Sequence, residues 1–310
     1  MGLKESFTLL RDSGKDFIDD DCPTQAAALS YYTIFSLPPL LVLILMILGA
    51  LVDPQDIRGQ LELQMGALMG PTATGQIRTI LQQAHNPGSG SLLPTLLSIG
   101  ALILGASGAF GQLQVALNRA WEVAPDPQQG GLKAFLLKRV FSFGMILSVA
   151  FLLLVSLVLS AALTAFGGAL GGMLPEGVSA TLLQVVNQAV SLVVVTALFA
   201  AIFKVLPDAT VAWRDVWVGA AVTAVLFVVG KFAIGFYLGR SNPGEAFGAA
   251  GSLAVMLVWV YYSSMILLYG AEFTQAWAES RGGGIAPERG AVHVVQEKKE
   301  VREGQPVAAG

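Results

Sequence analysis

The chain has 310 residues, of which 54% are hydrophobic and only 13% are charged, and its formal net charge is −3. A soluble domain carries about 25% charged residues, so this composition excludes an ordinary soluble protein. The apolar runs are continuous rather than alternating, which excludes a transmembrane β-barrel. A helical membrane bundle remains, because helices satisfy their own backbone groups in lipid.

Residues 1–22 form a charged segment without the apolar core of a secretory signal peptide. Apolar side chains recur among these charges: Phe7, Leu10, Phe17 and Ile18. This pattern predicts a short cytoplasmic amphipathic helix at the inner membrane surface. The chain has a single cysteine, Cys22, so we expect no intramolecular disulfide and no thiolate metal cage.

Six apolar stretches follow, near Leu37–Val52, Leu92–Phe110, Val140–Phe166, Leu182–Leu206, Val216–Leu238 and Gly251–Ala271. A helix needs about 20 apolar residues to cross the hydrocarbon core. Five stretches meet this length, and the first does so if Ala26–Ser36 continues the same helix. We therefore predict an all-α integral membrane protein, a six-transmembrane-helix bundle over residues 23–278 with short interfacial helices. Pro38 and Pro39 are expected to bend or restart the first helix.

Three further segments have a predicted form. The outer loop, residues 53–91, has helical composition at Ile57–Leu68 and Thr74–Gln83. Gly105, Gly108 and Gly111 place small residues on one stripe of the second span, where they allow a close helix contact. The polar tail, residues 279–310, is predicted to be a disordered cytoplasmic segment.

The distribution of cations predicts the orientation in the membrane. The N-terminal tail, the second and fourth loops and the C-terminal tail together hold 14 of the 18 Lys and Arg residues, and the other connections hold 3. Cytoplasmic loops carry such an excess. We therefore expect a multi-pass protein of a bacterial plasma membrane, with its N- and C-termini both in the cytoplasm.

Two charged residues of the spans are candidate substrate contacts. Lys231 is the cation within a span, in its outer half at 1.5 Å per residue. It either snorkels to the outer surface or lines a cavity and attracts an anion such as a lipid phosphate. Glu272 ends the sixth span, where it either partners a helix end, Arg119 or Lys204, or gates a substrate.

A second group of candidates lies on the helix that leaves the second span. Asn118, Arg119 and Glu122 follow its polar face. They form either a wetted helix face or the inner closure of a bundle cavity, through hydrogen bonds to residues 25–32. We keep both interpretations open.

Polar residues of the fourth and sixth spans complete the candidates. Gln184, Asn187 and Gln188 open the fourth span at spacings of three and four. They are either ordinary interfacial residues or the wall of a polar cavity. Tyr261 and Tyr262 lie midway along the sixth span, where they either form interhelical hydrogen bonds or line a pathway.

Four separated segments, in order along the chain, carry a recognisable pattern: Ala26–Pro39, Ala116–Val123, Lys204–Lys231 and Phe247–Glu272. Their sequences include AAALSYYTIFSLPP, ALNRAWEV, KVLP, WVYY and LYGAE. Together they resemble the YihY/virulence factor BrkB family of bacterial membrane proteins over roughly residues 20–278. The resemblance implies six spans and links to serum resistance and envelope lipid transport. The older family label of ribonuclease BN, for tRNA processing, is regarded as a misassignment, and no catalytic residues carry over.

Polar residues at several depths, an intramembrane lysine and a sizeable outer loop favour a transporter-like or lipid-handling protein that moves an envelope lipid or an amphipathic anion. No phosphate-binding loop G-x-x-x-x-G-K-[ST] occurs, so transport would be passive, ion-coupled or driven by partners. The alternative is a non-catalytic envelope scaffold or assembly factor. A tRNA-processing ribonuclease is least favoured, because the cytoplasmic loops lack a cluster of carboxylates or histidines to hold catalytic cations.

These observations also set the expected partners. We expect no enzymatic activity, no cofactor, no metal and no nucleic acid. Membrane lipids are the expected partners, and envelope proteins or a second copy of the chain remain open.

Overall fold

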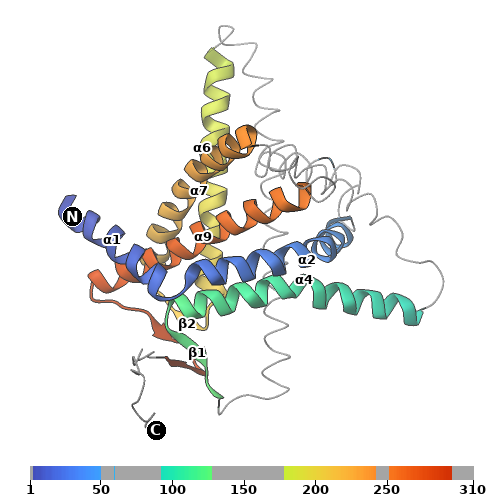
Figure 1. Cartoon of the computed structure of the whole chain (residues 1–310), viewed down its shortest axis with the longest axis horizontal. Coiled ribbons are helices and arrows are strands. Elements are labelled where there is room, and N and C mark those ends of the chain that lie inside the picture. The colour runs from blue at the N-terminus through green and yellow to red at the C-terminus, as the bar shows by residue number, and fades with distance from the viewer. Residues whose placement is uncertain (1–2, 50–58, 60–91, 128–177, 242–250, 295–310) are drawn as a thin grey trace.

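The computed structural model describes residues 3–49, 59, 92–127, 178–241 and 251–294 (Figure 1). A short helix, α1 (Leu3–Asp19), precedes five long ones: α2 (Cys22–Gly49), α4 (Leu92–Ala120), α6 (Val178–Val205), α7 (Trp213–Ser241) and α9 (Gly251–Ser280). Each long helix contains most of one predicted apolar stretch. The predicted third span, Val140–Phe166, and the two helices of the outer loop lie outside the described residues.

Three segments of the described helices are long and apolar enough to cross a membrane: Gln188–Val205, Trp213–Phe236 and Leu253–Ser280. The structure therefore agrees with a mainly helical membrane protein. That the chain has six transmembrane spans stays a prediction.

The helix α2 runs without interruption through Pro38 and Pro39, so a restarted helix at this point is the wrong expectation. The reason is its contact with α4, where Gly105 leaves room for the ring of Pro39; a Cβ at Gly105 would lie 2.9 Å from Cγ of Pro39. The hydroxyl of Ser36 accepts a hydrogen bond from the backbone N of Ala109 (3.1 Å), which ties the two helices together.

The predicted glycine stripe contributes two of its three members to this contact. A Cβ at Gly108 would lie 3.0 Å from Oγ of Ser36, whereas a Cβ at Gly111 would meet nothing within 4 Å. Gly105 and Gly108 therefore allow the close approach of α2 and α4, and Gly111 does not take part.

The closest helix crossing joins α7 and α9 through two reciprocal glycine–threonine contacts. A Cβ at Gly219 of α7 would collide with Oγ1 of Thr274, and a Cβ at Gly270 of α9 would collide with Oγ1 of Thr223. Each threonine is held in place, because its hydroxyl donates a 2.7 Å hydrogen bond to the carbonyl four residues earlier in its own helix. Small residues allow such close backbone contact within a membrane.

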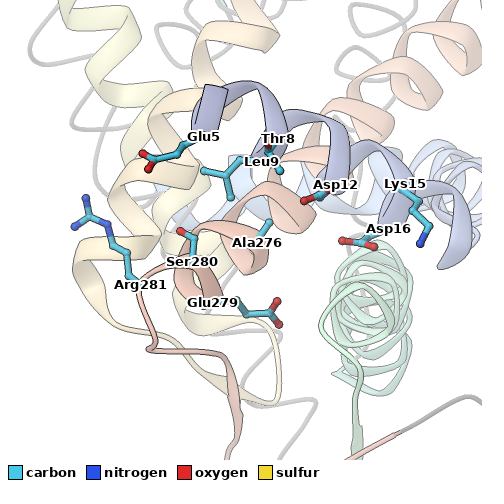
Figure 2. A pocket seen from close by; sticks show the side chains of 10 residues that line it. All are labelled: Glu5, Thr8, Leu9, Asp12, Lys15, Asp16, Ala276, Glu279, Ser280 and Arg281. Carbon is cyan, nitrogen blue, oxygen red and sulfur yellow. The ribbon is translucent and has the colours of Figure 1, made fainter. Parts of the chain in front are cut away.

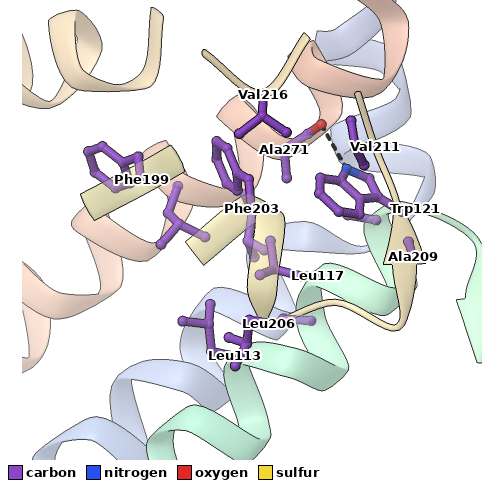
Figure 3. Close-up of a cluster of buried hydrophobic side chains, with 14 of the residues drawn as sticks. Leu113, Leu117, Trp121, Phe199, Phe203, Leu206, Ala209, Val211, Val216 and Ala271 are labelled. Carbon is purple, nitrogen blue, oxygen red and sulfur yellow. Dashed lines mark hydrogen bonds between the residues drawn. The ribbon is translucent and has the colours of Figure 1, made fainter. Parts of the chain in front are cut away.

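The helix α9 organises the described bundle, because it contacts α1, α2, α4 and α7. Most of the buried core gathers where α4 and α6 end and α2 and α7 begin, and Figure 3 shows part of it from close by. Leu117 and Trp121 of α4 and its following turn meet Phe203 of α6, and all three are fully buried. The indole Nε1 of Trp121 donates a 3.0 Å hydrogen bond to the carbonyl of Ala271 in α9, so the core also fixes α4 against α9.

The prediction of a disordered tail over residues 279–310 is wrong for residues 281–294. Strand β4 (Ala291–His293) pairs antiparallel with β1 (Val123–Pro125), and β3 (Ala286–Pro287) pairs with β2 (Ala209–Thr210). The loops after α4 and α6 supply the backbone partners that order this polar segment. Residues 295–310 lie outside the part of the chain that the structure describes.

The amphipathic N-terminal helix is confirmed as α1, which packs on α9. The rings of Phe17 and Tyr269 lie 6.1 Å apart, and the hydroxyl of Tyr269 donates to the carbonyl of Leu10 (3.0 Å). Phe7 and Ile18 of the same helix are exposed, as a membrane-surface helix requires. Its location at the inner surface stays a prediction.

Helix α1, strands β1 and β2 and the C-terminal end of α9 gather at one end of the helices (Figure 1). We call this end the loop end. It contains the described parts of the four segments in which the sequence concentrates its cations. That the loop end faces the cytoplasm stays a prediction from this charge distribution.

The α7–α9 crossing leads to a stability prediction. We expect Gly270→Ala to lower the free energy of unfolding by about 1–3 kcal/mol, the usual cost of overpacking, because Thr223 cannot move without losing its hydrogen bond. Thermal unfolding of the purified protein in detergent measures this.

Gly235→Ala is the matched control in α7. A Cβ there meets nothing within 4 Å, so alanine should stabilise the helix by about 0.5–1 kcal/mol. Equal effects of the two substitutions would contradict the proposed role of the crossing.

Candidate functional site

A partly buried hydrogen-bond network at the loop end joins α4 to the connection between α6 and α7. Asn118 donates through Nδ2 to Oδ2 of Asp208 (2.7 Å) and accepts through Oδ1 from the backbone N of Asp208 (2.8 Å). Gln114 donates to the second carboxylate oxygen of Asp208 (3.1 Å). The amide nitrogen and the amide oxygen of Asn118 thus both bond to Asp208. These bonds hold the polar face of α4 against the loop between α6 and α7.

Both sequence interpretations of Asn118 are therefore wrong. Asn118 is only 6% exposed, so it is not a wetted face, and its partner is Asp208 rather than residues 25–32. In that segment, Gln25 instead accepts a hydrogen bond from Gln112 (3.3 Å). Asp208 itself was missed, although a carboxylate directly after the Lys204–Pro207 motif was a visible signal.

Arg119 and Glu122 lie beside this network. The guanidinium of Arg119 forms an ion pair with Asp21 (3.5 Å), at the junction of α1 and α2. Asp21 and Glu122 both have a left-handed backbone, with φ of 58° and 51°, a conformation that commonly ends a helix. The Nε of Arg119 is buried and has no hydrogen-bond partner among the described residues.

Glu272 partners a helix end, the start of α2, which is one of the alternatives that the sequence offered. Its carboxylate is 2% exposed and accepts a hydrogen bond from Sγ of Cys22 (3.2 Å), whereas Arg119 pairs with Asp21. Lys204 donates to the carbonyl of Val211 and lies 5.6 Å from the ring centroid of Trp213. The predicted pairing of Glu272 with Arg119 or Lys204 is wrong, because both cations are used elsewhere.

A cavity of about 270 Å³, which we call the loop-end cavity, opens beside Asn118 and Arg119. Its walls combine charged, amide and apolar residues: Asp20, Gln114, Val115, Asn118, Arg119, Glu122, Val123, Ala124, Pro125 and Val294. Burial, followed by the charge of Glu122, raises the pKa of Asp20 to about 6. The cavity therefore holds two carboxylates that are not well compensated.

A second cavity, of about 260 Å³, lies between the long helices, and we call it the interhelix cavity. All five long helices contribute to its walls: Leu29, Thr33, Leu40, Ala109, Phe110, Leu113, Phe199, Phe227, Trp259, Val260, Ser263, Ser264 and Leu267. Most of these side chains are apolar, and three carry a hydroxyl. The hydroxyl of Ser263 is buried and has no partner within the described part of the chain.

A wider groove of about 900 Å³ separates α1 from the end of α9 (Figure 2). Its charged lining residues include four carboxylates and two cations: Glu5, Asp12, Asp16, Glu279, Lys15 and Arg281. Figure 2 shows that these side chains come from both helices. No set of three or more His, Cys, Asp or Glu residues that could hold a metal ion occurs within the described ranges.

Four other predicted site residues, Lys231, Tyr261, Tyr262 and Gln188, are not among the described residues that line these three hollows. Lys231 is partly buried, with its ammonium 5.6 Å from the ring centroid of Phe232. Tyr261 packs against the buried core, and Tyr262 lies against Gly230. Gln188 is exposed. Gln184 and Asn187 belong to α6, but the described side chains do not include theirs.

Comparison with known proteins gives a consistent family. The model of the virulence factor BrkB family matches residues 14–292. UPF0761 membrane proteins of Alcanivorax borkumensis and Alkalilimnicola ehrlichii are 27% and 30% identical to the chain, over 88% and 84% of its length. The chain spans only 60% and 56% of these two relatives.

A Bacillus subtilis relative, named a ribonuclease-like protein, YfkH, is 25% identical over 80% of the chain and 87% of its own length. No solved structure matches the chain.

The network around Asp208 leads to a second stability prediction. Asn118→Ala should lower the free energy of unfolding by about 1–3 kcal/mol, because it removes two hydrogen bonds of a buried amide to the half-buried Asp208. Thr210→Ala removes an exposed hydrogen bond of 3.0 Å to the carbonyl of Ala286 and should cost less. Chemical or thermal unfolding distinguishes the two, and equal losses would contradict a structural role of this network.

The pKa of Asp20 predicts a pH-dependent stability. Because the folded-state pKa is near 6 and the ordinary value is about 4, the folded protein holds this proton more tightly than the unfolded chain. Its contribution to stability is present below about pH 4 and is lost as the pH rises through 6. Asp20→Asn should therefore raise the melting temperature at pH 7.5, and the gain should vanish near pH 4.

Melting curves in lipid-free detergent at several pH values test this, with the exposed Asp12→Asn in α1 as control. The gain should be modest, because Asp20 is only partly buried and water screens its charge. A constant difference between wild type and Asp20→Asn at all pH values would contradict the assignment.

Proposed function

The chain belongs to the virulence factor BrkB family of membrane proteins, and we propose that it is a non-catalytic, lipid-handling protein that binds and moves an envelope lipid or a similar amphipathic anion. The observation that carries this proposal is the interhelix cavity. Binding sites are typically concave and mostly apolar, with a few polar groups that fix the orientation of the ligand.

The chemistry of the interhelix cavity fits one end of a lipid acyl chain. Phe199, Phe227 and Trp259 supply apolar surface from three different helices. The hydroxyl of Ser263 lacks a hydrogen-bond partner in the described structure, and a buried group of this kind costs free energy until it is satisfied. An ester or carboxylate oxygen of a lipid would accept a hydrogen bond from the hydroxyl of Ser263. The acyl chain of the lipid would cover the aromatic walls of the cavity.

The size of the interhelix cavity limits the mode of binding. Its volume of about 260 Å³ is below the roughly 300–1,000 Å³ of sites that enclose a drug-sized ligand. The interhelix cavity can therefore hold only part of a lipid molecule, and the rest of the lipid would lie outside the helices.

The outer faces of the helices support a location in lipid. Val225, Val229, Phe232 and Phe236 are exposed along α7, where water would be an unfavourable neighbour for so much apolar surface. Trp213 and Trp217 are exposed in the first turns of the same helix, as expected of an aromatic belt at the membrane boundary.

The alternative function is an envelope scaffold or assembly factor. The groove between α1 and α9 favours it, because its charged lining and volume of about 900 Å³ suit an extended segment of a partner protein. This alternative needs no movement of lipid, so the two functions differ in a measurable way.

The test is a lipid transfer assay with the full chain reconstituted in vesicles. Fluorescent anionic lipid is placed in one leaflet, and its appearance in the other is followed against empty vesicles. Wild type should accelerate transfer. Ala109→Leu, which fills the interhelix cavity, should slow it by about tenfold, the equivalent of about 1.4 kcal/mol.

Ala221→Leu is the matched control, because Ala221 is exposed on α7. It should transfer lipid as wild type does, and both variants should keep their melting temperatures. Transfer by wild type no faster than in empty vesicles would contradict the proposal and favour a scaffold. Equal transfer by Ala109→Leu and Ala221→Leu would remove the interhelix cavity from the mechanism.

A further inference from the structure

The loop-end cavity lies at the depth of lipid headgroups if the helices cross a membrane. One of its walls, Val115 of α4, is an apolar side chain that is 55% exposed. Another lining residue, Asn118, bonds to Asp208, five residues before the exposed Trp213. Aromatic residues of this kind mark the boundary between the hydrocarbon core and water, which places the cavity near this boundary in a helix bundle that crosses the membrane.

Arg119 presents an incomplete set of partners in this cavity. Its guanidinium makes one ion pair, at 3.5 Å, with Asp21. Its Nε is buried and has no partner within the described ranges. A guanidinium matches a phosphate group through paired hydrogen bonds. The Arg119 side chain as a whole is 34% exposed, so a phosphate oxygen can reach its guanidinium beside the ion pair.

The charges of the cavity do not suit a simple anion. Asp20 and Glu122 both line it, while the charge of Arg119 is already shared with Asp21. Both carboxylates line one small cavity, and burial, followed by the charge of Glu122, raises the pKa of Asp20. A positively charged group between the two carboxylates would relieve their repulsion, and an anion alone would meet an excess of negative charge.

The volume of the cavity matches a headgroup rather than a whole lipid. Its 270 Å³ is the space of about nine water molecules at ~30 Å³ each. Val115, Val123 and Pro125 give one side an apolar surface, where the start of an acyl chain or the glycerol carbons can pack.

From these observations we propose that the loop-end cavity binds a zwitterionic phospholipid headgroup, with the phosphate at Arg119 and a primary ammonium group between Asp20 and Glu122. This inference rests on the proposed lipid-handling function and names its substrate class: phospholipids with an amine-bearing headgroup, in preference to anionic ones.

The test measures binding rather than transport. The full chain is purified in detergent, and short-chain phosphatidylethanolamine, phosphatidylglycerol and phosphatidic acid are titrated against it by native mass spectrometry. Soluble glycerophosphoethanolamine forms a fourth arm. Wild type should bind the ethanolamine lipid about tenfold more tightly than the glycerol lipid, because the ammonium group adds a charge-assisted hydrogen bond.

The variants separate the two halves of the headgroup. Glu122→Gln should weaken phosphatidylethanolamine about tenfold and leave phosphatidylglycerol unchanged. Arg119→Gln should weaken all three lipids. The controls are Glu288→Gln and Arg289→Gln, two exposed positions between β3 and β4, which should bind as wild type does. If Glu122→Gln does not fold, Asp20→Asn supplies the same comparison.

The outcomes distinguish this inference from the function on which it rests. Equal binding of ethanolamine and glycerol lipids by wild type, or an unchanged preference in Glu122→Gln, overturns the headgroup assignment even if lipid transfer in vesicles is normal. Binding of the soluble compound without binding of the lipid supports the recognition chemistry and contradicts the lipid-handling function.

Discussion

The close crossing of α7 and α9 is the contact on which the rest of the described structure depends. In lipid, helices gain nothing by hiding apolar surface from one another, so they associate through packing and hydrogen bonds. Gly219 and Gly270 let each helix receive a threonine of the other. This arrangement holds the rings of Phe227 and Trp259 together, with their centroids 6.1 Å apart. Both rings form part of the wall of the interhelix cavity.

The same crossing also affects the loop end, because α9 extends from the crossing to that end. Ala271, next to Gly270, accepts the hydrogen bond of Trp121, and Glu272 accepts that of Cys22. Three consecutive residues of one helix thus join it to α7, to α4 and to α2. Because protein interiors are densely packed, a shift of α9 against α7 would reach both cavities at once.

The sequence predicted those features that follow from local composition and missed those that depend on tertiary contacts. The apolar stretches located the five long helices, and the charges of residues 1–22 located α1. The continuity of α2 through Pro38 and Pro39 depended on a glycine of another helix. The order of residues 281–294 depended on backbone partners in two distant loops. Asn118 and Arg119 were placed on α4 correctly, whereas Glu122 lies in the turn after it, and the partners Asp208 and Asp21 could not be paired without the fold.

The strands of the C-terminal segment have a mechanical consequence. By pairing with β1 after α4 and with β2 between α6 and α7, a segment that follows α9 connects the ends of α4 and α6 and the start of α7. These helices cannot separate at that end while both pairings persist. A rocking motion of the helices must therefore pivot at the loop end and separate them most at the opposite membrane surface. Otherwise it must begin with the loss of the two strand pairings.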